Sequence, residues 1–189
     1  MTPETIVSIF LGVGLAASAG FRVFLPLFAL SLAAYFDIWQ LNGNWQWIGS
    51  LAAVLTLGVA TMVELFAYFI PFVDNALDAI ALPLAAIAGT AVMVSTVADL
   101  DPVVTWSLAI IAGGGTASAI KGANAAGRLT TTATTGGLAN PVVSTVETGT
   151  ATVVATASIF APMLAVVLVI IILGFVFMIY RKLRPKPKT

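Results

Sequence analysis

Two glutamates, Glu64 and Glu147, interrupt apolar stretches of this 189-residue chain, and each directly follows a valine. In a membrane helix, a charged side chain near the bilayer centre costs about 2.5–3.5 kcal/mol, so it is usually paired, neutralised or hydrated. One interpretation is that the two carboxylates meet and bind a cation or carry protons. The other is that one or both cap a helix or pair with Arg22, Lys121 or Arg128.

A polar segment, residues 121–140 (KGANAAGRLTTTATTGGLAN), contains few large apolar side chains. Its threonine hydroxyls could line a polar path or bond to backbone carbonyls, and its small residues could simply pack tightly between helices. The arginines either attract an anionic substrate or neutralise the glutamates. Besides the glutamates, the candidate substrate-binding or ion-binding residues are Arg22, Arg128, Ser18, Ser118, Thr131, Thr132 and Asn140.

Two aspartates, Asp74 and Asp78, are four residues apart and would share one helix face. They are candidate ligands of a small cation, which prefers oxygen ligands. The alternative, which the preceding Pro71 favours, is a helix start at which Asp74 is the cap. The chain has no Cys and no His, which excludes disulfides, thiolate catalysis and the usual zinc sites. We expect no cofactor, no metal centre and no enzymatic activity.

The composition is that of an integral membrane protein. Hydrophobic residues make up 60% of the chain, charged residues 8%, and the mean hydropathy is +1.07. A soluble domain is about a quarter charged. Because no basic patch with interleaved aromatic residues is present, nucleic-acid binding is not expected.

Apolar stretches predict an all-α fold. The first and last are too long for one span of about 20 residues. The breaks are expected at Pro26 or at Gly14 and Gly20, and at Gly149 or Ala161-Pro162. Residues 22–36 and 121–136 are expected to be re-entrant or broken. The apolar stretches are residues 4–36, 46–70, 76–97, 102–120 and 141–180.

The order of several motifs indicates an internal repeat. Residues 14–19 (GLAASA) resemble 114–119 (GGTASA), the start Thr2-Pro3 resembles Asp101-Pro102, and Val63-Glu64 resembles Val146-Glu147. We therefore expect a single membrane domain of about six transmembrane helices, arranged as two inverted three-span repeats. The first repeat would cover residues 1–98 and the second repeat residues 99–182. Residues 183–189 would form a basic cytoplasmic tail.

The orientation follows from the distribution of basic residues, which favour the cytoplasmic side. Five of the eight Lys and Arg residues lie in residues 181–188, and none lies between Arg22 and Lys121. Three crossings per repeat would put the Trp-rich loop 37–47 outside and both termini in the cytoplasm. The expected location is the bacterial inner (plasma) membrane, with membrane lipids as partners.

Residues 14–28 (GLAASAGFRVFLPLF), the run 113–122 (GGGTASAIKG) and the Thr-rich segment before Asn140-Pro141 carry a resemblance that covers nearly the whole chain. In these motifs the chain resembles a family of small bacterial membrane proteins catalogued as domain of unknown function 4126. The resemblance implies a multi-span bacterial inner-membrane protein and supplies no activity.

The function expected from these residues is a small transporter or channel for a small solute or ion, in which intramembrane glutamates bind a cation or proton. A structural or assembly subunit is the alternative, and a homodimer is compatible with either. A membrane enzyme acting on lipid-linked substrates is the weakest candidate, because phosphate chemistry usually needs a clustered basic or His-containing site.

Overall fold

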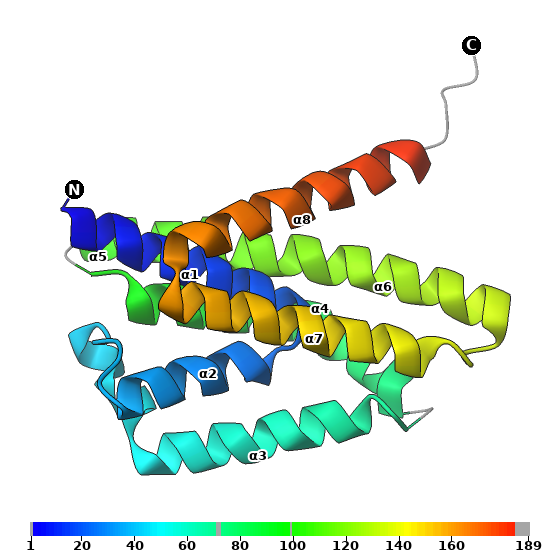
Figure 1. Ribbon diagram of the computed structural model, residues 1–189, viewed down its shortest axis with the longest axis horizontal. Helices are drawn as coiled ribbons and strands as arrows, with labels where there is room; N and C mark the ends of the chain where they lie inside the picture. Colours follow the sequence, from blue (N-terminus) through cyan, green and yellow to red (C-terminus); the bar gives the residue numbers. More distant parts are fainter. Residues whose placement is uncertain (1, 71–72, 99, 184–189) are drawn as a thin grey trace.

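The computed structural model describes residues 2–70, 73–98 and 100–183, without the side chains of residues 74, 75, 179, 180, 182 and 183. Helices and their connections account for these residues, and no strand occurs among them (Figure 1). The helices are α1 (Pro3–Phe21), α2 (Phe24–Tyr35), η1 (Gly43–Gly49), α3 (Leu51–Ala67), α4 (Val73–Thr96), α5 (Pro102–Leu108), η2 (Ala109–Gly114), α6 (Gly115–Thr135), α7 (Asn140–Phe160) and α8 (Pro162–Leu183). The prediction of an all-α protein is confirmed.

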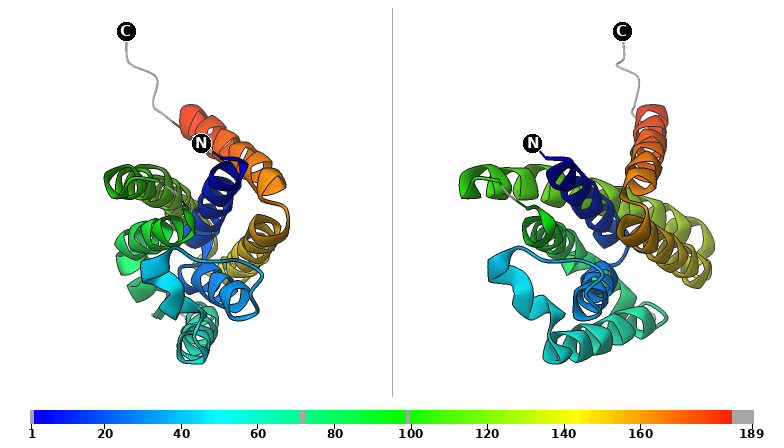
Figure 2. Two further views of the ribbon diagram at one scale, coloured as in Figure 1. Left: turned by 90° about the vertical axis from the view of Figure 1, so that its left-hand side faces the viewer. Right: turned by 60° about the vertical axis from the view of Figure 1, so that its left-hand side comes forward.

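Helix α1 lies at the centre of the bundle. It packs against α2, α4, α6, α7 and α8, and the end-on view shows it among them (Figure 2). Small residues allow this close packing. A Cβ at Gly20 would lie 2.6 Å from the Cβ of Ile120 on α6, so only glycine fits at this crossing.

Local signals mark the helix starts as expected. The Thr2 side chain accepts a hydrogen bond from the backbone N–H of Thr5, and Pro3 follows it. The Asp101 carboxylate accepts from the backbone N–H of Val103, before which Pro102 opens α5. These side chains occupy N–H groups that the first helical turn leaves unpaired.

The two long apolar stretches are both broken, at one expected and one unexpected position. The break at Ala161-Pro162, between α7 and α8, is confirmed. In the first stretch the break falls at Arg22–Val23, so the expectation of Gly14, Gly20 or Pro26 was wrong. Pro26 lies in the first turn of α2, where a missing N–H costs little. Helix α2 therefore tolerates Pro26 in its first turn.

The expectation of a re-entrant or broken segment at residues 121–136 was wrong. Pro102–Thr135 is one helical stretch of 34 residues made of α5, η2 and α6. Four threonine hydroxyls of α6 bond to the carbonyl four residues earlier, as Thr130 does to Ala126. These bonds keep polar side chains satisfied within a continuous helix.

The described residues contain four helices long and apolar enough to cross a membrane, and up to five if the bent pair η1 and α3 forms one span. Six spans are not confirmed. The inverted repeat and the division into residues 1–98 and 99–182 remain predictions, because α1–α2 is broken where the matching α5–α6 is continuous.

One end of the bundle is defined by three contacts between distant segments. Ser8 near the start of α1 accepts from the backbone N–H of Ala98 at 3.2 Å. Asn42 donates its backbone N–H to Ser95 at 2.9 Å, and Trp39 donates to the Ile159 carbonyl at 2.9 Å. Helix α8 begins at this end and runs to the other. The start of α1 and the end of α8 therefore lie at opposite ends of the bundle (Figure 1). The side of the membrane that each terminus faces remains a prediction.

Candidate functional site

Charged side chains gather where α1 is interrupted inside the bundle. We call Arg22, Glu64, Asp78, Lys121, Arg128 and Glu147 the charged cluster; its three cations lie around the ring of Tyr68. Arg22 is 0% exposed, Lys121 2% and Arg128 3%. Because burial of unpaired charge is costly, each of these groups needs a partner or a role.

Glu64 stabilises the break from a different helix, α3. Its two carboxylate oxygens accept the backbone N–H of Val23 at 2.7 Å and that of Phe24 at 3.0 Å. These N–H groups open α2, whose N-terminus carries partial positive charge. Glu64 thus caps α2 in place of a local capping residue, as the second interpretation of the glutamates anticipated.

Arg22 occupies the break itself, in an extended conformation (φ −136°, ψ 122°). Its Nε donates to Thr148 Oγ1 at 2.9 Å, and its Nη2 donates to the Ser144 carbonyl at 2.8 Å. Nη2 also lies 3.5 Å from a Glu147 carboxylate oxygen. Its remaining nitrogen, Nη1, is buried without a hydrogen-bond partner. Arg22 therefore ties the break to α7 and keeps one donor unused.

Arg128 joins three helices. Its Nε lies 3.3 Å from Glu147 on α7, and its Nη1 lies 3.3 Å from Asp78 on α4. Its Nη2 donates to the Ser144 hydroxyl. Asp78 is the most accessible of these side chains, at 22% exposure. The arginine on α6 is thus held by carboxylates of α4 and α7.

The aromatic ring of Tyr68, one residue past the end of α3, lies among three cations. The Arg22 and Arg128 guanidinium carbons are 4.1 Å and 4.7 Å from the ring centroid. The Lys121 Nζ is 5.3 Å from it and donates to the Tyr68 hydroxyl at 3.2 Å. Cations over an aromatic face are attracted by its quadrupole, most strongly when desolvated. Tyr68 therefore offsets part of the repulsion among like charges.

The structure brings Glu147, Arg22 and Arg128 together, while Glu64 binds backbone at the edge of the same cluster. No contact joins the two glutamates among the described residues. Asp78 pairs with Arg128, and the side chain of Asp74 lies outside the part of the chain that the structure describes.

The side-chain contacts of the other candidate residues join neighbouring helices or belong to their own helix. Ser18 donates to the Ala151 carbonyl at 2.9 Å and joins α1 to α7. Ser118 lines a groove with Trp45 and Thr90. Thr131 bonds to its own helix, and Thr132 bonds to Asn140 across the α6–α7 turn. These contacts are those of helix packing and turn formation.

Sequence reasoning missed Tyr68 and the two α7 residues that hold the arginines, Ser144 and Thr148, and it considered Lys121 only as a partner for the glutamates. Helical spacing contained the signal. Tyr68 is four residues after Glu64, Ser144 is three before Glu147, and Thr148 is four after Ser144. A search for polar residues one turn from each glutamate would have found Tyr68 and Ser144, and one further turn from Ser144 would have found Thr148.

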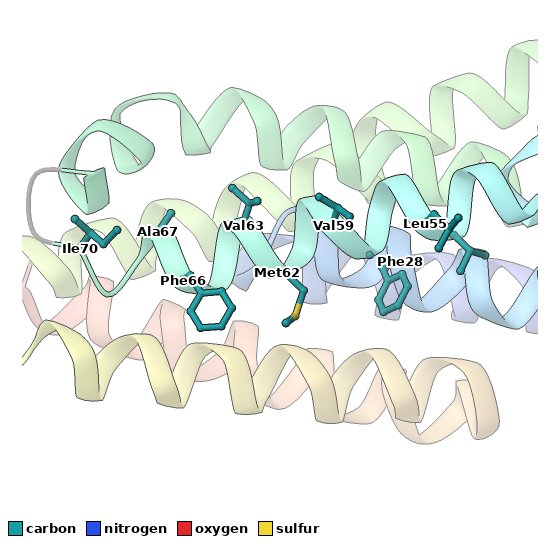
Figure 3. A pocket seen from close by; sticks show the side chains of 10 residues that line it. Phe28, Leu55, Val59, Met62, Val63, Phe66, Ala67 and Ile70 are labelled. Atoms are coloured by element: carbon teal, nitrogen blue, oxygen red, sulfur yellow. The ribbon is translucent and has the colours of Figure 1, made fainter.

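The outer face of α3 differs sharply from its inner face. Glu64 and Tyr68 are buried, whereas Val59, Met62 and Phe66 are more than half exposed. Figure 3 shows Met62 and Phe66 on the same side of α3, with Phe28 of α2 nearby. This apolar groove suits contact with lipid chains, which solvate apolar side chains as well as a protein core does.

Comparison with known families assigns most of the chain to one family model. Residues 9–182 match a domain of unknown function, DUF4126. The chain belongs to this family. No curated protein and no solved structure matches it. Membership in DUF4126 confirms the resemblance read from residues 14–28 and 113–122, and the charged cluster lies within the matched region.

Proposed function

We propose that this DUF4126 protein is a small membrane transporter or channel for a small solute or ion. The observation that carries the proposal is the charged cluster at the interruption of the central helix. In transporters, broken helices commonly present free backbone groups and charged side chains near the membrane midplane. Ionisable residues inside membrane proteins usually mark a substrate or ion pathway because their burial is otherwise unfavourable.

The break gives the cluster a means of changing its shape. Val23 and Phe24 are held by Glu64, while the neighbouring Arg22 is held by α7. A movement of α3 relative to α7 would therefore pull the two sides of the break apart. Alternating access through relative movement of helices is a general transporter mechanism.

For the membrane arrangement, we propose that α1, although long enough to span, turns back with α2 as a hairpin that enters from one side. In this proposal α3, α4, the α5–α6 helix, α7 and the shorter apolar helix α8 cross. The basic C-terminal end faces the cytoplasm of a bacterial inner membrane. The N-terminus then faces the opposite side, which revises the expectation of two cytoplasmic termini. The spacing keeps the sign of a repeat, because Arg22 and Lys121 are separated by the same number of residues as Pro3 and Pro102. Ser8 of α1 bonds to Ala98 just before α5, so α1 and the α5–α6 helix start at the same end, and this pair does not have the opposite directions that an inverted repeat requires.

The glutamates have two alternative roles in such a transporter. The pairing of Glu147 with two arginines favours a role in holding the binding groups. Direct binding of a cation or proton by Glu64 and Glu147 is the alternative, and it requires Glu147 to leave Arg128 during the cycle.

Flux into proteoliposomes tests the proposal. Swelling and tracer uptake are measured with small neutral, cationic and anionic solutes. Lys121→Met and Tyr68→Phe are expected to reduce flux at least tenfold. The matched controls are Arg181→Met, which removes an exposed cation, and Tyr35→Phe, at an exposed tyrosine. Both control variants are expected to retain the flux of the wild type. Absence of flux for every solute class, or equal flux in all variants, would refute the proposal; purification as an obligate complex with another protein would favour the assembly subunit.

A further inference from the structure

Lys121 is a buried cation that forms no salt bridge with a carboxylate in the part of the chain that the structure describes. No carboxylate of the described residues lies within 4.0 Å of its Nζ, and its hydrogen bond goes to the neutral Tyr68 hydroxyl. An ammonium has three donors, so two remain for another group. A buried charge of this kind is costly unless a counter-charge accompanies it.

Two further donors near Tyr68 are unused. Arg22 Nη1 is buried and without a hydrogen-bond partner, and the Arg22 guanidinium carbon lies 4.1 Å from the Tyr68 ring centroid. The Tyr68 hydroxyl accepts from Lys121 and keeps its own proton for donation. Unused donors of three residues thus converge on one aromatic side chain.

We propose that Arg22, Lys121 and Tyr68 form a binding site for a small oxyanion, either a carboxylate or inorganic phosphate. This inference rests on the proposed transport function and specifies its substrate class. The planar guanidinium fork and the ammonium are the groups that proteins use for carboxylate and phosphate oxygens. The bound anion supplies the direct contact with a negative group that no described carboxylate makes with Lys121.

The cluster's own carboxylates do not fill this role. Glu64 is occupied by the start of α2, and Asp78 and one oxygen of Glu147 face Arg128. The second oxygen of Glu147 lies 3.5 Å from Arg22 Nη2. That oxygen, Asp78 Oδ1 and Arg22 Nη1 are all buried without a hydrogen-bond partner, and Nη1 is the only donor of the three. The carboxylates therefore fix the two arginines and leave Nη1 and Lys121 for the anion.

Thermal unfolding of the full chain in a phosphate-free detergent tests the site. Potassium acetate, potassium phosphate and potassium chloride are each titrated into low-salt Tris buffer. A ligand that binds only the folded state raises the melting temperature in a saturable way. We expect acetate or phosphate to do so, and Lys121→Met to abolish at least nine-tenths of the shift. Arg181→Met should retain the whole shift.

Lys121→Met is expected to fold, because methionine replaces an unpaired buried charge with an apolar chain of similar length. Should it fail to fold, Tyr68→Phe provides the second variant. It removes one hydroxyl, keeps the ring, and is expected to raise the half-saturating anion concentration about tenfold, which corresponds to loss of about 1.4 kcal/mol.

Other results would overturn the oxyanion site. Equal shifts of the melting temperature with all three salts, or shifts retained in both Lys121→Met and Tyr68→Phe, would do so. So would a shift with the potassium salts that is absent with the choline salts of the same anions, or stabilisation by phosphatidylglycerol alone. Flux without anion-dependent stabilisation would leave transport intact and overturn only the oxyanion. Stabilisation by acetate or phosphate without any flux would support the oxyanion site and overturn the transport function.

Discussion

Arg22 shows how one side chain can serve both the fold and a function. Three of its contacts, with Thr148, the Ser144 carbonyl and Glu147, hold the break against α7. Its Nη1 takes part in none of them. The residue is thus fixed on one side of the guanidinium and available on the other, which is the arrangement expected of a preorganised binding group.

Glu147→Gln should strongly destabilise the protein. The substitution removes the negative charge shared by Arg22 and Arg128. Breaking a buried ion pair by removing one partner costs about 3–5 kcal/mol, because it leaves uncompensated charge. The measurement is thermal unfolding in detergent. Glu4→Gln, on the exposed first turn of α1, is the control and should change little. An unchanged melting temperature for Glu147→Gln would contradict the ion-pair assignment.

Glu64→Gln should have a smaller effect than Glu64→Leu. Glutamine retains one acceptor oxygen for the Val23 N–H and loses the one that binds the Phe24 N–H. We expect a loss of about 1–2 kcal/mol for glutamine and more for leucine, which leaves both N–H groups unpaired. Hydrogen exchange at Val23 and Phe24 in the two variants reports on the cap directly. Equal exchange in the wild type and Glu64→Leu would show that Glu64 is not the cap.

Sequence alone located the two glutamates and offered capping and arginine pairing as one of two interpretations. It could not assign Glu64 to the cap and Glu147 to the pair. That assignment depends on how α3 and α7 pack against distant segments: Glu64 is 41 positions from Val23, and Thr148 is 126 positions from Arg22. Local periodicity carries no such information. Lys121 was recognised as basic, but the absence of a salt bridge between Lys121 and the carboxylates that the structure describes is a property of the packed bundle.

At the scale of the element, the same limit explains both errors about broken helices. The first break depends on a carboxylate from α3, so nearby Gly and Pro residues do not set its position. Conversely, residues 121–135 look unsuited to a membrane helix, yet Lys121 and Arg128 are buried inside the bundle, and the threonines bond to their own backbone. Tertiary contacts thus override the hydropathy pattern in both places.

The crossing of α4 with η2 should depend on a glycine pair. A Cβ at Gly113 would lie 2.5 Å from the Gly89 carbonyl oxygen, whereas one at Gly115 meets nothing within 4 Å. Gly113→Ala should therefore cost about 1–3 kcal/mol through overpacking. Gly115→Ala, the matched control, should stabilise the helix by about 0.5–1 kcal/mol. Thermal unfolding of the two variants, with shifts of opposite sign, checks the crossing; shifts of the same sign would contradict it.

For the whole molecule, the distribution of polarity explains how a charged centre is compatible with a membrane. Large apolar side chains on the outer faces of α3, α7 and α8 are exposed, among them Phe66, Val153 and Phe175. The charged cluster lies between α1, α3, α4, α6 and α7, whose residues contact one another there. Burying charge inside a bundle, away from lipid, is how membrane proteins retain functional ionisable residues.

The path of the chain predicts that the N-terminus and the Trp-rich loop lie on the same side of the membrane. The bonds of Ser8 to Ala98 and of Asn42 to Ser95 gather these segments at one end. No Lys or Arg occurs in residues 2–8, 36–50 or 97–103, whereas five lie in residues 181–188. Because basic residues favour the cytoplasm, the end that contains residues 2–8 should face outward.

Because the chain has no native cysteine, single-cysteine labelling can test this arrangement without background. Glu4→Cys and Asn44→Cys should react with a membrane-impermeant maleimide in intact spheroplasts. Leu138→Cys, at an 87% exposed position on the opposite end, should react only after lysis. Reaction of Leu138→Cys alone in intact cells would reverse the orientation. Labelling of Asn44→Cys without Glu4→Cys would place the two segments on opposite sides of the membrane and would contradict the contacts that gather them at one end.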